Sequence, residues 1–175
     1  MVDAVGINRN YVDTVADIVR RALDLKIPIQ LEAVCNAVEH KLPGNCIPAD
    51  LNELDVDAKI KAVNDSEFEI YYLRNRPSTS VLFPISHELG HLFLHLLDKE
   101  GKLKADEVCQ RNLMQTQQKL EADEFAAAFL MPEEAFINEC KEQIRGDRVN
   151  VTKVANYFNV PVQTATVRGN VLGLW

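Results

Sequence analysis

The chain of 175 residues lacks the features of several common classes of protein. Its four cysteines form no C-x-x-C pair and show no zinc-finger spacing, which argues against a zinc-finger module. Its most apolar stretch, residues 89–97, is interrupted by Gly90, His91 and His95 and is too short to cross a bilayer. We therefore predict neither a zinc finger nor a membrane protein.

An excess of positive charge is also missing, because 26 acidic residues outnumber 19 Lys and Arg for a net charge of −7. Neutralising phosphates requires a basic surface, so direct DNA binding is not expected as the main activity. The opening residues 1–4 show no basic and apolar signal segment, and we expect a cytoplasmic protein. In that compartment thiols stay reduced, and the alternative is a redox-sensitive Cys109 in a polar loop. The expected free thiols are Cys35, Cys46, Cys109 and Cys140.

The length predicts a single domain over residues 1–175. Apolar residues at helical spacing predict two helices within residues 1–44. The first would be capped by Asn10 and bury Tyr11 and Ile18, and the second would end before Pro43. Residues 45–57 are polar and acidic and are predicted to be loop. Residues 58–62 and 67–72 then alternate with a period of two, which predicts a β-hairpin at the start of a core region, residues 57–145.

Helical spacing returns at Pro84, a residue suited to the first turn of a helix. A further helix is predicted over residues 118–131, cut by Pro132, and another from there to Gly146. Residues 149–175 resemble a helix-turn-helix, in which Lys153 and Arg168 are the basic residues of segment 151–168; packing or substrate docking is favoured over contact with DNA. The pattern as a whole predicts an α+β fold that is mostly helical.

One five-residue run carries the chemistry, the H-E-x-x-H motif from His87 to His91. Residues four apart share one face of a helix, so both imidazoles can reach one metal ion. Zinc suits two neutral imidazoles and a carboxylate, with a position left for water. Glu88 need not bind the ion and can act as the general base towards that water. We therefore predict His87 and His91 as metal ligands and Glu88 as the catalytic residue.

The residues alone leave the third ligand open. Along a regular helix His95 lies about 6 Å beyond His91, too far for the same ion, and it could support a ligand, face substrate or be structural. Taken alone, the acidic run 121–124 is more typical of a solvated helix face than of a ligand. On that helix Glu121 and Glu124 occupy neighbouring stripes, and Asp123 points away from Glu121.

The two motifs together, residues 87–95 and 121–132, resemble the ImmA/IrrE family of metallopeptidases in order and separation. The resemblance implies zinc held by His87, His91 and Glu121, in a thermolysin-like minimal core of two helices and a small antiparallel sheet. His95 and Glu124 are candidates for supporting positions. The sequence differs from the family pattern at Asp123, usually Asn, and at Phe129, usually Leu. Phe125 stands where the larger thermolysin-like group often has an aspartate, so the group that orients His87 stays open.

The resemblance also implies a dedicated substrate: a helix-turn-helix repressor, cleaved to derepress the genes of a phage, mobile element or stress operon. The acidic balance agrees with a basic partner, and the hairpin strand 68–72 could pair with an extended substrate segment. The alternative is an antirepressor or antitoxin-like protein that sequesters its partner without cleavage, and a second is a DNA-binding regulator. The same ligands would also accept Mn²⁺ or Co²⁺.

Overall fold

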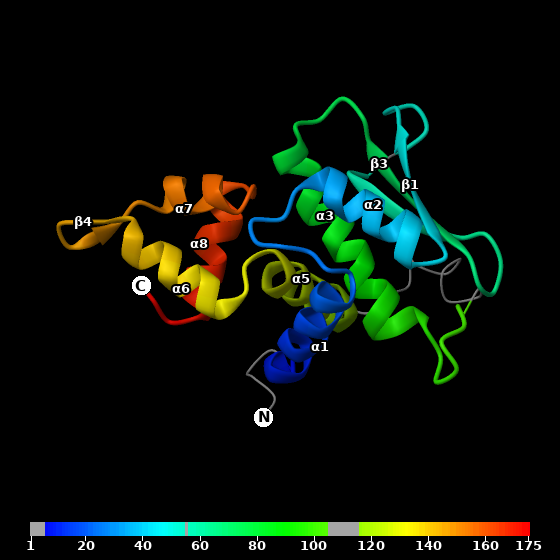
Figure 1. Ribbon diagram of the computed structural model, residues 1–175, viewed down its shortest axis with the longest axis horizontal. Coiled ribbons are helices and arrows are strands. Elements are labelled where there is room, and N and C mark those ends of the chain that lie inside the picture. Colours follow the sequence, from blue (N-terminus) through cyan, green and yellow to red (C-terminus); the bar gives the residue numbers. More distant parts are fainter. Residues whose placement is uncertain (1–5, 55, 105–115) are drawn as a thin grey trace.

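The computed structural model describes residues 6–54, 56–104 and 116–175. As predicted, the fold is α+β and mostly helical, with a small sheet at one end of the molecule (Figure 1). The sheet, α2 and α3 lie at one end of the molecule, and the C-terminal helices α6 to α8 lie at the other (Figure 1). Helices α1 and α5 lie between them, so α5 stands where the two ends of the molecule meet.

Helix α1 spans Arg9–Ala22, and its cap is Asn8, two residues before the predicted cap, because the side chain of Asn8 accepts the N–H of Tyr11. The prediction of its buried face was partly wrong. Val12 and Ala16 point inward, whereas Tyr11 and Ile18 are 57% and 60% exposed. Helix α2, Leu31–Lys41, ends before Pro43 as predicted.

The sheet contains β1 (Gly44–Ala49), β2 (Ala58–Ala62) and β3 (Phe68–Leu73) in the order β1-β3-β2. The predicted hairpin is confirmed as the antiparallel pair β2–β3. The predicted loop over residues 45–57 was wrong at its start, because β1 pairs with β3 in parallel. Pro48 obscures this strand in the sequence, but an edge strand tolerates a residue without an N–H. Strand β3 is therefore central, and the edge strand beside α3 is β2.

Helix α3 spans Ser78–His91, so the predicted start at Pro84 was wrong by six residues. Pro84 lies inside the helix, where it removes one backbone hydrogen bond and disfavours the helical geometry. The helix continues anyway because its flanking residues, Leu82 and Ile85 among them, are fully buried. A single π-helical turn, Leu92–Leu96, follows directly and carries His95.

Helix α5, Thr116–Leu130, and helix α6, Glu133–Glu142, flank Pro132 as predicted. Helix α6 ends earlier than expected, since a short hairpin of β4 (Ile144–Arg145) and β5 (Arg148–Val149) turns at Gly146 with φ of +66°. The tail forms α7 (Val151–Tyr157) and α8 (Val162–Val171), the two helices predicted there.

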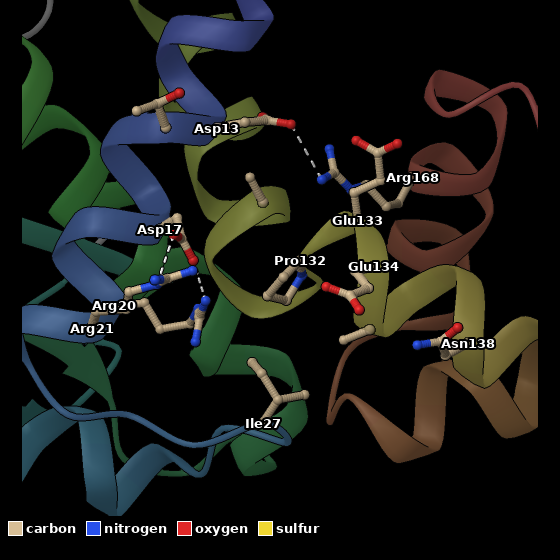
Figure 2. Close-up of a pocket in the computed structure, with 13 residues that line it drawn as sticks. Asp13, Asp17, Arg20, Arg21, Ile27, Pro132, Glu133, Glu134, Asn138 and Arg168 are labelled. Atoms are coloured by element: carbon tan, nitrogen blue, oxygen red, sulfur yellow. Dashed lines mark hydrogen bonds and ion pairs between the residues drawn. The ribbon is translucent and has the colours of Figure 1, made fainter.

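Arg168 of α8 connects the C-terminal helices to α1 and α5 through buried polar contacts. Its guanidinium is buried and donates to Glu124 of α5 at 2.8 Å, to the carbonyl of Met131 at 3.2 Å and to Asp13 of α1 at 3.5 Å. Figure 2 shows the contact with Asp13. These internal contacts occupy the guanidinium of Arg168 and argue against its contact with DNA.

Three of the four cysteines, Cys35, Cys46 and Cys140, carry free thiols, as predicted. Cys109 lies outside the described residues. No helix in the described ranges is long and apolar enough to cross a membrane.

Candidate metal centre

Helix α3 and the π turn after it place three histidines in a row. The ring centroids of His87 and His91 are 4.7 Å apart, and those of His91 and His95 are 5.2 Å apart. This follows from spacing, because side chains four residues apart lie one above the other on a helix. The predicted position of His95 assumed a regular α-helix. The residue lies instead in a π turn, which is wider than an α turn.

Glu88, the residue after the first histidine, is buried with only 7% of its surface exposed. One carboxylate oxygen accepts the backbone N–H of Ile60 at 2.9 Å. Edge strand β2 thus holds the carboxylate in a fixed orientation beside the histidines. His87, Glu88 and Asp123 line a cavity of about 320 Å³, together with Phe83 and the start of β2.

Gly90 brings the second motif against the first. A Cβ at Gly90 would lie 3.1 Å from the Cα and the carbonyl oxygen of Ala122 and from the Cβ of Phe125. Helices α3 and α5 therefore touch almost backbone to backbone at Ala122. The side chains on either side of Ala122, Glu121 and Asp123, leave the line of contact in opposite directions and reach opposite ends of the histidine row.

Asp123 is the residue that contacts and orients His87. Its Oδ1 lies 2.7 Å from Nδ1 of His87. When Nδ1–H donates to a carboxylate, the imidazole carries its lone pair on Nε2, which is the form that binds metals. The sequence alone does not assign this role to Asp123. The usable signal was its position two residues after Glu121 on a helix that packs on the motif.

At the other end of the row, His95 Nε2 lies 3.0 Å from Oε2 of Glu121, and His95 Nδ1 lies 3.1 Å from Nδ1 of His91. Burial lowers the pKa of His95, and the hydrogen bond to Glu121 raises it in part. A neutral His95 that donates from Nε2 to Glu121 accepts from His91 at Nδ1. That assignment gives His91, like His87, a lone pair on Nε2.

The donor chemistry of this cluster fits a divalent transition metal, because two imidazoles and a carboxylate lie on facing helices. Glu121 accepts hydrogen bonds from His95 and from Gln117 at 3.0 Å. Among the described residues, no group of three or more His, Cys, Asp or Glu side chains is positioned to hold a metal ion as it stands.

Glu124 lies on the other side of α5. It is 6% exposed and pairs with Arg9 and Arg168, and not with the histidines. The structure thus brings together His87, Glu88, His91, His95 and Glu121 and places Glu124 in the contact between α1, α5 and α8.

A larger cavity, of about 630 Å³, lies away from the histidines between α1, α6 and α8 (Figure 2). Its charged walls are partly neutralised by contacts within the protein. Asp17 pairs with Arg20 and Arg21, and Asp13 with Arg168. None of the three histidines lines it.

Comparison with known proteins supports the relationship that the two motifs suggested. A search of curated proteins found no match to the chain. A family model described as IrrE N-terminal-like domain, a peptidase family, matches residues 50–170. The match covers both motifs, α3 and α5, and extends into α8. The chain belongs to the family of peptidases with an IrrE N-terminal-like domain.

Proposed function

We propose that this protein is a zinc-dependent endopeptidase that cleaves a helix-turn-helix transcriptional repressor at one or a few bonds. The observation that carries the proposal is the row of histidines on α3 with a buried Glu88 beside it. Membership of a peptidase family supports it independently.

In this proposal His87, His91 and Glu121 would hold the ion, with Glu121 as the third ligand. Zinc would supply a Lewis acid that polarises the peptide carbonyl and acidifies water. Asp123 and His95 fix the tautomers of the two ligand histidines. Glu88 removes a proton from the attacking water and passes it to the leaving amine.

Edge strand β2 is suited to bind the substrate backbone. It is an outer strand of the sheet, and its residue Ala58 lines the cavity that contains His87 and Glu88. An extended segment that pairs with an edge strand gains main-chain hydrogen bonds and is aligned along it. This arrangement would place a peptide bond of the segment next to Glu88.

A repressor fits the charge of the chain, because a DNA-binding domain is basic and this protein has a net charge of −7. Specificity in this proposal comes from docking of the folded repressor. Docking holds the scissile bond in place and replaces a bimolecular encounter with an oriented one. Short peptides that cover the cut site should therefore be poor substrates.

The direct test mixes the purified protein, Zn²⁺ and a helix-turn-helix repressor encoded beside its gene, and follows fragments by mass spectrometry. We expect one or two cuts in the repressor and little cleavage of unfolded casein. The Glu88→Gln variant should bind the repressor but lose cleavage by at least about 100-fold.

Two outcomes would contradict the proposal in different ways. An uncut repressor that loses DNA binding equally with wild type and Glu88→Gln would show sequestration without proteolysis. Rapid cleavage of casein at many sites would leave the peptidase in place and exclude the dedicated regulatory role.

A further inference from the structure

A second cavity adjoins the candidate metal centre on the side of the C-terminal helices. It has a volume of about 480 Å³ and lies between α3, α5, α8 and the segment leading into α1. Phe83 and Asp123 belong both to its wall and to the wall of the cavity that contains His87 and Glu88. The two cavities are therefore neighbours that share these two wall residues.

Most of the wall of this second cavity is apolar. The apolar residues that line it come from the segment before α1, from α3 and α5, and from the start and body of α8: Ile7, Phe83, Leu120, Ala127, Pro161, Val167 and Val171. On α8, Val167 and Val171 are 53% and 37% exposed. Apolar surface gathered in a concave site is typical of ligand-binding pockets.

The charged residues of the wall are engaged within the protein. Arg9 and Arg168 both pair with Glu124, and Asp123 contacts His87. A charged ligand would have to compete with these contacts, whereas an apolar side chain gains by leaving water. The pocket therefore selects for apolar groups.

From this arrangement we propose that the pocket receives an apolar side chain of the substrate polypeptide, of the size of Leu, Met or Phe, close to the scissile bond. The inference rests on the proposed peptidase function, since that function brings a polypeptide to the adjoining cavity. It also gives α8 a role in choosing the cleaved bond, because Val167 and Val171 line the pocket. Docking of the folded repressor still selects the substrate, and the pocket then favours a cut at a fixed distance from an apolar residue.

The pocket can be tested by binding alone. The probes are acetylated pentapeptide amides, Gly-Gly-Xaa-Gly-Gly, with Leu, Phe, Asp or Lys at Xaa, added to the full chain. Methyl NMR signals of Val167, Val171 and Leu120 report occupancy. We expect saturable shifts with the Leu and Phe peptides and at least about a tenfold weaker response to Asp and Lys, as for loss of a good apolar contact.

Two valine variants provide a matched comparison. Val167 and Val63 are 53% and 52% exposed, and only Val167 lines the pocket. Val167→Asp should weaken binding of the Leu peptide by at least about fivefold, and Val63→Asp by less than about twofold. Circular dichroism checks that both variants are folded, and Ala127→Leu, which adds bulk to the pocket wall, gives a second route to the same loss.

Equal binding of the Leu and Asp peptides, no binding of the Leu peptide, or equal effects of the two valine variants would overturn the inference. These outcomes are distinct from failure of the proposed function. Cleavage of the repressor that depends on Glu88, without binding of the Leu peptide, would refute the pocket alone. Selective binding of the Leu peptide without any cleavage would refute the peptidase and leave an apolar recognition pocket.

Discussion

Glu121 and Asp123 are two residues apart on α5, so their side chains leave the helix about 200° apart. Both nevertheless reach histidines of α3, because Ala122 between them packs on Gly90. The carboxylates therefore act at different ends of the row. Asp123 orients His87, and Glu121 contacts His95, which in turn contacts His91.

The role of Asp123 can be tested with two substitutions. Asp123→Ala should weaken zinc affinity by about 10- to 100-fold, because His87 loses the acceptor that fixes its tautomer. Asp123→Asn should lose less, since its amide oxygen can still accept from Nδ1–H. Competition with a chromophoric chelator measures both affinities. Wild-type affinity in Asp123→Ala would exclude an orienting role.

The contrast between Glu121 and Glu124 tests the third ligand. Glu121→Ala should weaken metal binding more than Glu124→Ala does, because Glu121 lies at the histidines and Glu124 lies with Arg9 and Arg168. The same chelator competition ranks the two variants. The reverse ranking would identify Glu124 as the third ligand and would show that the assignment of Glu121, which the family resemblance implies, is wrong.

At the scale of elements, the proposed metal centre depends on how closely α3 and α5 approach at Gly90. Gly90→Ala should have a small effect on stability, because about 1 kcal/mol gained in helix propensity opposes the crowding against Ala122. Gly90→Val should lower the free energy of unfolding by about 1–3 kcal/mol through overpacking, and should also weaken metal binding by separating the helices. Urea denaturation and chelator competition measure the two effects, and a fully stable Gly90→Val variant that binds zinc normally would contradict this.

The hairpin β2–β3 was predicted well because its strands keep an uninterrupted period of two, and helix α5 was predicted well because Pro132 marks its end. Strand β1 was missed because Pro48 and the polar residues after it suggest a loop, and its pairing with β3 is a contact distant in sequence. The start of α3 was not predicted, because a proline is typical of the first turn of a helix. Here Pro84 lies inside the helix, and burial of the flanking side chains outweighs the backbone hydrogen bond that the proline removes.

For the site, spacing alone was sufficient to predict that His87 and His91 share a face. The contacts of Asp123 and His95 were not predictable in this way. They depend on the angle at which α5 crosses α3 and on the π turn after His91, which are properties of tertiary packing.

Across the whole molecule, α5 has two functions on two faces. The face centred on Ala122 packs on α3, with Glu121 and Asp123 at its two edges, and the opposite face carries Glu124 into the buried contact with Arg168. The C-terminal helices are thereby fixed relative to the candidate metal centre, which is consistent with a role of α8 in binding substrate.

This connection predicts a loss of stability. Glu124→Ala leaves the buried guanidinium of Arg168 without its 2.8 Å partner, and removing one member of a buried pair costs about 3 kcal/mol or more. Glu121→Ala, at a more exposed position on the same helix, should cost clearly less in metal-free protein. Urea denaturation of both variants decides this, and equal losses would argue against a structural role for the Arg168 contact.

The central claim is that His87 and His91 bind a metal ion, and the most direct test is the metal content of protein purified without added metal. Elemental analysis by mass spectrometry should find one divalent ion per chain in the wild type, and none in the variant that combines His87→Ala with His91→Ala. The variant must first be shown to be folded by circular dichroism. Equal metal content in the two proteins would contradict the account.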